Sequence, residues 1–379
     1  MKILILTHSY PDNMNRWRGT FIRDQVKALS QVHDVIVVYF KVDNSRLAPF
    51  RNYSWFAKES GNLKEYTVTV PKFFPIINQG KYLLCTYRFI SRHIIKKVKI
   101  DVIHSHLSYP GGFLGTIIQK TKGIPNIITE HTWIKKYFRS FIHKLCVRYA
   151  LKNCTCIAAV SQALKEDIEM YCTNQVMVVP NVVDTERFRL PDLKRKREER
   201  INLGILGGYS NYRKGLDILF KSAALIKNTN FTIHVGGDGS LLDSFKNLAR
   251  ELGVYDNCKF YGEILPENLV EFYSGLDIFV LASRDETFGV VIIEALCCGI
   301  PVIATKCGGP QEIITQDTGI LVEKENPQQL AEAIELMSKN LDSYDRDVIR
   351  GYAIDKYSPD AFNESITRLY QSVLNRKTR

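Results

Sequence analysis

Two glutamates stand eight positions apart in an otherwise apolar stretch of the second half of the chain. Glu286 follows Asp285 after a strand-like run, and Glu294 lies among Val, Ile, Ala, Leu and Cys residues. Gly299 and Pro301 end the helix that this pattern predicts. A helical rise of ~1.5 Å per residue would separate the two carboxylates by about 12 Å along the axis. That separation suits a nucleoside diphosphate sugar, which has a hydroxyl-rich group at each end and phosphates between them.

A simpler alternative is that Glu286 caps the helix and Glu294 is a solvated helix position. A carboxylate among apolar neighbours needs a partner, which favours a functional role for Glu294. A strand followed by a loop and a helix also places backbone N–H groups and the positive end of the helix dipole at the carboxyl edge of the strand. Thr287, Phe288 and Gly289, at the predicted helix start, are therefore candidates for binding phosphate.

The pair Glu286 and Glu294 resembles the E-x7-E motif of retaining glycosyltransferases of family 4. Further motifs fall in the family's order and cover most of the chain: 179–184 with Phe188, Lys214-Gly215, 237–239, 260–262, 299–305, 308–312 and 319–322. The resemblance implies an α/β chain of the GT-B fold, with two Rossmann-like β/α/β domains facing each other across a cleft. It also implies a retaining hexosyltransferase that needs no metal and no cofactor beyond its nucleotide-sugar co-substrate.

The resemblance also implies roles for individual residues. Glu286 would hold sugar hydroxyls, His131 would orient the transferred sugar and Lys214 would neutralise the leaving diphosphate, so these three are the candidate catalytic residues. The other residues expected to bind the donor are Gly19, Arg213, Gly237, Leu265, Thr287, Phe288, Gly289 and Glu294, the last at the ribose. The family's arginine five residues before the lysine is replaced by Tyr209, and Arg213 is the candidate substitute.

The first half alternates strand-like runs with helical stretches, which predicts a parallel doubly wound sheet. Gly19 stands just before a predicted helix, where it would let the backbone approach a diphosphate; an ordinary helix-entry glycine is the alternative. His104 and His106 follow the fourth strand and His131 the fifth, at ends that face ligands in such folds. We expect a structural role for His104. His106, Lys135 and Arg139 are expected on the acceptor side.

The chain of 379 residues is long enough for two domains with full cores. We predict an N-terminal, acceptor-side domain over 1–187 and a nucleotide-sugar domain over 188–358. The second domain has strand-like runs at 201–206, 231–235, 259–261, 278–281, 302–304 and 320–322. The final segment, 359–379, is helical in pattern, and the resemblance suggests that it packs back on the first domain.

Basic residues are concentrated in the first half. Residues 1–190 hold 28 Lys and Arg against 13 Asp and Glu, and two stretches, 66–100 and 131–165, contain no acid at all. Aromatic residues run through both stretches, which favours an anionic membrane surface or an anionic lipid-linked acceptor. We expect Lys96, Lys97 and Arg139 to contact the membrane. A solvated basic face is the alternative, and no motif indicates a nucleic-acid partner.

Nine scattered cysteines fit neither zinc spacing nor a secreted disulfide framework, and no apolar run reaches the ~18 residues of a spanning helix. We therefore expect a cytoplasmic protein associated peripherally with the inner face of the cell membrane. Its expected activity is sugar transfer to a lipid-linked or saccharide acceptor in cell-surface polysaccharide biosynthesis. One alternative is a nucleotide-sugar epimerase of the same fold. The other is a non-catalytic scaffold, and the replacement of the family's arginine by Tyr209 favours it.

Overall fold

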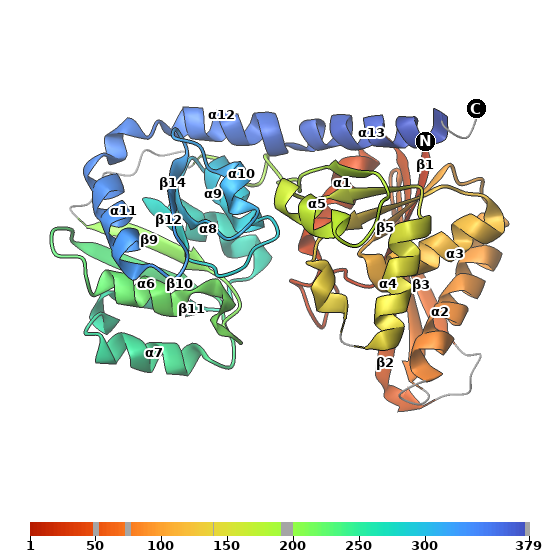
Figure 1. Ribbon diagram of the computed structural model, residues 1–379, viewed down its shortest axis with the longest axis horizontal. Coiled ribbons are helices and arrows are strands. Elements are labelled where there is room, and N and C mark those ends of the chain that lie inside the picture. The colour runs from red at the N-terminus through yellow and green to blue at the C-terminus, as the bar shows by residue number, and fades with distance from the viewer. Residues whose placement is uncertain (48–52, 73–76, 139, 191–199, 376–379) are drawn as a thin grey trace. The chain divides into compact units, whose positions relative to one another are not determined.

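The computed structural model describes residues 1–47, 53–72, 77–138, 140–190 and 200–375. The chain forms two compact units, each a sheet flanked by helices (Figure 1). Unit 1 comprises Met1–Val182 with Phe362–Arg379, and unit 2 comprises Val183–Ala361. The predicted domain boundary at 187/188 lies beside a charged segment, of which 191–199 fall outside the described residues.

Unit 1 is built on an eight-stranded sheet in the order β3-β4-β2-β1-β5-β6-β7-β8, parallel except for the β3–β4 pair. Its strands are β1 (Lys2–Thr7), β2 (Asp34–Leu47), β3 (Ser54–Ser60), β4 (Leu63–Lys72), β5 (Val102–His106), β6 (Asn126–Glu130), β7 (Cys156–Ala159) and β8 (Val176–Val178). Its α-helices are α1 (Thr20–Ser30), α2 (Ile77–Phe89), α3 (Phe113–Lys122), α4 (Phe141–Asn153), α5 (Gln162–Glu169) and, from Phe362 onward, α13 (Pro359–Asn375).

Alternation along β1 divides the core of unit 1 between the two faces of the sheet. Ile3 and Ile5 pack with α1 and α13 on one face, while Leu4 and Leu6 pack with α2 and α3 on the other. Successive side chains of a strand point to opposite faces, so a strand covered on both sides reads as a continuous apolar run. The predicted doubly wound sheet is therefore confirmed in this unit.

Unit 2 has a six-stranded parallel sheet in the order β11-β10-β9-β12-β13-β14. Its strands are β9 (Ile201–Leu206), β10 (Phe231–Gly236), β11 (Cys258–Gly262), β12 (Ile278–Leu281), β13 (Val302–Thr305) and β14 (Gly319–Val322). Its α-helices are α6 (Leu216–Ala223), α7 (Leu242–Glu251), α8 (Leu269–Ser274), α9 (Val290–Cys297), α10 (Pro310–Ile313), α11 (Pro327–Lys339) and α12 (Arg346–Tyr357). Apolar residues of α6, α7 and α11 pack into one core with the strands.

Some features differ from what the sequence predicts. The exposed strand β3, which pairs antiparallel with β4, was not predicted. Its three apolar residues, 55–57, stand together and are followed by Lys58 and Glu59, so the segment shows neither strict alternation nor a long apolar run. The predicted axial separation of about 12 Å between the two glutamates is wrong, because it assumed that both belong to one helix. Helix α9 begins only at Val290, and Glu286 instead lies in an extended bridge with Gly308, so helical rise does not apply between 286 and 289.

Candidate functional site

The Glu286 backbone is fixed on both sides by the neighbouring loop. Its N–H donates to the Cys307 carbonyl at 3.1 Å, and its own carbonyl accepts from the Gly309 N–H at 3.0 Å. The residue is 8% exposed. A buried carboxylate needs compensating charge and hydrogen bonds, so the groups around its side chain determine its role.

Two cations from one short turn meet the Glu286 carboxylate. The turn η4 (Tyr212–Lys214) joins β9 to α6, and the Lys214 Nζ lies 2.5 Å from Glu286 Oε1. Arg213 Nη1 lies 3.0 Å from Glu286 Oε2. Two cations against one carboxylate leave an excess positive charge at this position. Such an arrangement can receive an anionic group, after which the carboxylate becomes free to accept hydrogen bonds from hydroxyls.

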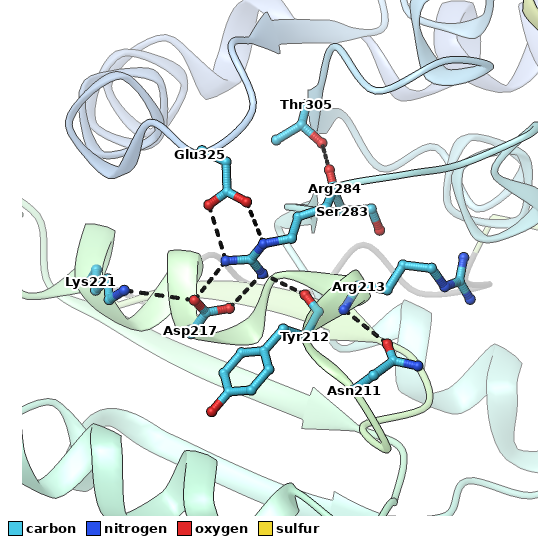
Figure 2. A network of polar contacts seen from close by, with 9 residues as sticks. All are labelled: Asn211, Tyr212, Arg213, Asp217, Lys221, Ser283, Arg284, Thr305 and Glu325. Carbon is cyan, nitrogen blue, oxygen red and sulfur yellow. Dashed lines mark hydrogen bonds and ion pairs between the residues drawn. The ribbon is translucent and has the colours of Figure 1, made fainter.

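Arg284, two residues before Glu286, connects that turn to the end of β12 (Figure 2). Its guanidinium donates to both oxygens of Asp217, at 2.8 and 2.9 Å, and it also contacts Glu325 and the Tyr212 carbonyl. Asp217 also lies 3.7 Å from Lys221. The hydrogen bond to Asp217, together with the bond to Glu325, raises the pKa of Arg284, although burial opposes it. The sequence pattern did not predict this network.

Tyr209, at the position of the family arginine, belongs to the core. It is fully buried, its ring lies 6.0 Å from Phe245, and its hydroxyl donates to the Gly236 carbonyl at 3.2 Å. Burial raises the pKa of its phenol, which therefore stays neutral. The side chain at this position supplies no charge, whereas the Arg213 guanidinium does reach the carboxylate that Lys214 contacts.

The start of α9 lies directly after Glu286. Gly289 is the N-cap residue with φ 107°, and Phe288 is buried with its ring 5.9 Å from that of Tyr357. Thr287 is partly buried. Within α9, Glu294 accepts a hydrogen bond of 2.8 Å from the hydroxyl of Tyr273, which supplies the partner that a carboxylate among apolar residues requires.

Gly237 brings the end of β10 against the loop after β9. It has φ 116°, and a Cβ at this position would lie 1.8 Å from the Gly207 carbonyl oxygen, so only glycine fits. Its N–H donates to the Gly262 carbonyl at 2.7 Å, which joins it to the end of β11. Leu265 follows that strand and is partly buried.

Gly19 occupies the left-handed region at the N-cap of α1. Its φ is 68°, and a Cβ would lie 2.3 Å from the Ser9 carbonyl oxygen. The loop from Ser9 to Gly19 therefore closes tightly on itself. Any residue with a side chain would force the loop apart.

Three histidines form a stacked column in unit 1. The ring centroids of His104 and His106 lie 4.5 Å apart, and those of His106 and His131 lie 5.4 Å apart, with His106 Nδ1 3.1 Å from His131 Nε2. His104 bonds the hydroxyls of Tyr370 and Thr129 at 2.6 Å each, and full burial fits its predicted structural role. Burial lowers the pKa of His104 and of His131 to about 3, so both rings are neutral near pH 7.

Glu130 fixes the loop that carries His131, and sequence analysis did not identify it. Its carboxylate is fully buried and accepts from Ser108, from the N–H groups of His131 and Thr132 at 2.9 and 3.0 Å, and from the Tyr137 hydroxyl. Burial raises the pKa of Glu130, although these hydrogen bonds oppose the shift. The signal available in the sequence was an acid at a strand's carboxyl end.

The residues expected on the acceptor side lie in different surroundings. His106 is fully buried beneath His131, Lys135 is exposed in the turn η3 (Ile134–Tyr137), and Arg139 lies outside the described residues. Lys96 and Lys97 are exposed. Ser161 caps α5 by accepting from the Leu164 N–H at 3.0 Å.

Within the described residues, no three His, Cys, Asp or Glu side chains form a group that could hold a metal ion. No helix in the same residues is long and apolar enough to cross a membrane.

Two protein families match almost the whole chain between them. Residues 19–187 match Glycosyltransferase Family 4, and residues 193–347 match Glycosyl transferases group 1. An uncharacterised glycosyltransferase of Methanocaldococcus jannaschii is 31% identical over 67% of this chain and 69% of its own. An alpha-monoglucosyldiacylglycerol synthase of Streptococcus pneumoniae is 29% identical over 58% of this chain and 55% of its own. The match therefore spans little more than half of the second relative.

Solved glycosyltransferase structures share the fold along the whole chain. A sucrose-phosphate synthase from Thermosynechococcus elongatus superposes with a TM-score of 0.78 at 20% identity, covering 99% of both chains. HepE of Anabaena, crystallised with UDP and glucose, gives 0.75 at 18% identity over 98% of this chain and 100% of its own. These likenesses confirm the predicted GT-B fold class.

Proposed function

The chain belongs to the glycosyltransferases of family 4, and we propose that it is a retaining, metal-independent hexosyltransferase that uses a nucleotide-sugar donor. The observation that carries the proposal is the Glu286 carboxylate held between Lys214 and Arg213, 2.5 and 3.0 Å away, just before the start of α9. This position combines cations for a diphosphate with an acceptor for sugar hydroxyls. The two functions are needed together only where both parts of one donor bind.

Lys214, Arg213 and the N–H groups at the start of α9 would neutralise the diphosphate. Glu286 would then accept hydrogen bonds from sugar hydroxyls, and Glu294, fixed by Tyr273, would hold the ribose. Negative charge grows on the leaving phosphate as the glycosidic bond breaks. Fixed cations at that position therefore stabilise the transition state more than the ground state.

Retention of configuration would follow from attack on the face that the phosphate leaves. The bond between the anomeric carbon and the phosphate oxygen breaks, and the acceptor oxygen forms its bond on the same face. The acceptor's proton passes to the departing phosphate oxygen. His131 is neutral near pH 7, so it would orient the sugar by a hydrogen bond and would not serve as a general acid.

The first donors to test are UDP-hexoses, because the structurally similar HepE of Anabaena was crystallised with UDP and with UDP-glucose. A donor at a hundredfold excess over its dissociation constant should stabilise the protein by about 2.7 kcal/mol in a thermal-shift assay. Product analysis by NMR would then show transfer with the anomeric configuration retained. Activity that disappears with a chelator would contradict the metal-independent mechanism.

Two other functions make different predictions. An epimerase would convert the donor without any acceptor, so product analysis separates it from a transferase. A scaffold would bind donor without turnover, and the burial of Tyr209 in place of a cationic side chain is the observation in its favour. Turnover that depends on Glu286 and Lys214 would exclude the scaffold.

We propose a lipid-linked saccharide acceptor of cell-surface polysaccharide biosynthesis and peripheral binding to the inner face of the membrane. The support is α4, which exposes Phe141, Ile142, Leu145 and Tyr149. The same helix carries Lys144, Arg148 and Lys152. Apolar side chains flanked by cations fit an anionic bilayer surface.

Vesicle sedimentation tests that surface. Phosphatidylglycerol vesicles should bind the protein, and phosphatidylcholine vesicles should bind it weakly. A variant with Phe141→Ser and Ile142→Ser should lose binding, whereas Leu336→Ser, a similarly exposed position on α11, should not. Each cation near the surface contributes about 1 kcal/mol, so Arg148→Gln should weaken binding roughly fivefold. Binding that ignores both lipid charge and salt would contradict the proposal.

A further inference from the structure

Unit 1 contains a pocket that the donor chemistry does not use. It has a volume of about 240 Å³ and lies between the loop from Tyr10 to Met14 and the β3–β4–β2 edge of the sheet. That volume is below the roughly 300–1,000 Å³ of pockets for drug-sized ligands, so it suits a single small ring.

The floor of the pocket follows from strand register. Val37 of β2 pairs with Glu65 of β4, and Glu65 pairs with Lys58 of β3. The next row on the same face consists of Tyr39, Thr67 and Phe56. Side chains in register on neighbouring strands share a face, so the first row presents charged groups beside an apolar one, and the second row presents two aromatic rings beside a hydroxyl.

The polar groups of the pocket are held in place by one another. Tyr10 donates its hydroxyl to Glu65 Oε1 at 2.6 Å. Asp12 Oδ2 accepts from the Tyr39 hydroxyl at 3.1 Å and from Lys41 Nζ at 2.8 Å. Burial raises the pKa of Tyr39 to about 12, with Asp12 adding to the shift, so this tyrosine stays a hydrogen-bond donor. Side chains that are already fixed lose little entropy when a ligand binds.

Phe56 supplies an apolar wall and is 53% exposed. An exposed aromatic ring next to fixed carboxylates matches a ligand with a C–H face on one side and hydroxyls around its edge. A sugar ring has this combination, because its C–H groups can pack on the aromatic face while its hydroxyls donate to carboxylate oxygens. A purely apolar ligand would displace water from Asp12 and Glu65 and offer no donor to their remaining lone pairs.

We propose that this pocket binds a sugar ring of the acceptor. The assignment rests on the proposed function, since it gives a glycosyltransferase a saccharide acceptor. It is supported by the loop that forms one wall of the pocket, because that loop ends at Gly19, the turn expected to meet the donor phosphates. One loop would then link the two substrates.

Saturation-transfer NMR with a set of methyl glycosides tests the pocket directly. The set contains the methyl glycosides of glucose, galactose, mannose, N-acetylglucosamine, rhamnose and glucuronic acid. At least one should bind the wild-type protein. Phe56→Ala should weaken its binding about tenfold, the size expected when an aromatic contact is lost. Glu65→Gln, which keeps the shape of the side chain, should weaken it as well.

Trp55→Ala is the matched control. Trp55 adjoins Phe56 on β3, is 46% exposed and packs against Tyr66 and Phe89 instead of lining the pocket. The control should bind the glycoside as the wild type does. No binding of any glycoside to the wild type, or equal binding to the wild type and Phe56→Ala, would overturn the pocket assignment.

A second measurement separates this inference from the donor proposal. UDP-glucose should raise the melting temperature of Phe56→Ala as much as that of the wild type. If no nucleotide sugar stabilises the wild type, the donor proposal fails even where glycoside binding to the pocket stands. A glycoside that saturating UDP-glucose displaces, and that Phe56→Ala still binds, occupies the donor position and contradicts the pocket assignment.

Discussion

The two units build their candidate sites from opposite kinds of electrostatics. In unit 2, Glu286 is compensated by Lys214 and Arg213, and the neighbouring Arg284 pairs with Asp217 and Glu325. In unit 1, His104, His106 and His131 are buried, stacked and neutral near pH 7. The charged site suits the diphosphate of a donor, and the neutral site suits the hydroxyls of a sugar.

Burying the two arrangements carries different free-energy penalties. A buried ion pair remains only where nearly every lone pair and proton is matched, because removing one partner leaves an uncompensated charge. A buried neutral imidazole keeps its place without a counter-ion, but folding then opposes its protonation. Unit 2 should therefore be sensitive to the loss of a single charged group, and unit 1 to acid.

The largest effect is expected from Lys214→Met. Removing the cation should lower kcat by about 10²–10³-fold, because a fixed charge at the leaving phosphate contributes mainly in the transition state. Lys246→Met is the matched control, since Lys246 pairs with an exposed aspartate on α7 and should leave turnover unchanged. Steady-state kinetics with a labelled donor would measure both variants.

Glu286→Gln complements that experiment. The amide keeps the shape of the side chain but removes the charge that Lys214 and Arg213 compensate, so sugar binding should weaken and kcat should fall with it. Wild-type turnover in both Lys214→Met and Glu286→Gln would show that the charged cluster is structural. The comparison between the two units would then lose its functional meaning.

Acidification should destabilise unit 1. The unfolded chain takes up a proton on each histidine below pH 6.5, whereas folded His104 and His131 resist it until about pH 3. The free energy of unfolding is therefore unaffected by these histidines above pH 6.5 and decreases as the pH falls below that value. At pH 5 each of these two histidines should lower the free energy of unfolding by about 2 kcal/mol relative to pH 7.

Hydrogen exchange resolved by peptide would measure this effect. Between pH 7 and pH 5, after correction for the intrinsic exchange rate, protection should fall in β5 and β6 before it falls in β9 and β12. His104→Asn removes one titrating group, so the protein should take up about one proton fewer when it unfolds at pH 5. Equal loss of protection in both units would show that the histidine column does not control acid sensitivity.

Most of the fold could be predicted from the sequence because most strands of the two sheets are parallel and buried. Such strands leave continuous apolar runs, such as Ile3–Leu6 and Ile278–Leu281, that a simple pattern reveals. Strand β3 was missed because its three apolar residues are followed by charged ones and form neither an alternating pattern nor a long apolar run. The apolar runs of buried strands made most of the prediction possible.

The candidate site was predicted in part, for a similar reason. Glu286 and Lys214 belong to ordered motifs, and the structure brings them within 2.5 Å of each other. Arg284 and Glu130 could not be predicted, because their roles depend on partners that lie far apart in the sequence, such as Asp217 for Arg284 and Ser108 for Glu130. A pattern along the chain does not contain those contacts.

Arg284→Lys should have an intermediate effect. Lysine keeps the charge but cannot donate to both oxygens of Asp217 while also contacting Glu325, so the turn that carries Arg213 and Lys214 should loosen. We expect about a tenfold fall in kcat with little change in donor KM, because the cations remain present but are less well placed. The split between kcat and KM distinguishes this positioning role from donor binding.

Lys221→Gln is the control for Arg284→Lys. Lys221 contacts Asp217 at 3.7 Å from a half-exposed position, so its loss should change activity little. An equal fall in kcat for both variants would assign the effect to Asp217 alone. An unchanged kcat in Arg284→Lys would show that the turn is held by its backbone, through the bond from the Arg284 N–H to the Arg213 carbonyl at 2.8 Å.

The smallest effect is expected from Tyr209→Phe. The change removes one hydrogen bond to the Gly236 carbonyl while keeping the ring in the core, so it should cost about 1 kcal/mol of unfolding free energy. Activity should stay near the wild-type value, since the charge at the phosphate comes from Lys214 and Arg213. A large loss of turnover at unchanged stability would place the Tyr209 hydroxyl in the donor site. The site in unit 2 would then depend on a neutral buried group, as the site in unit 1 does.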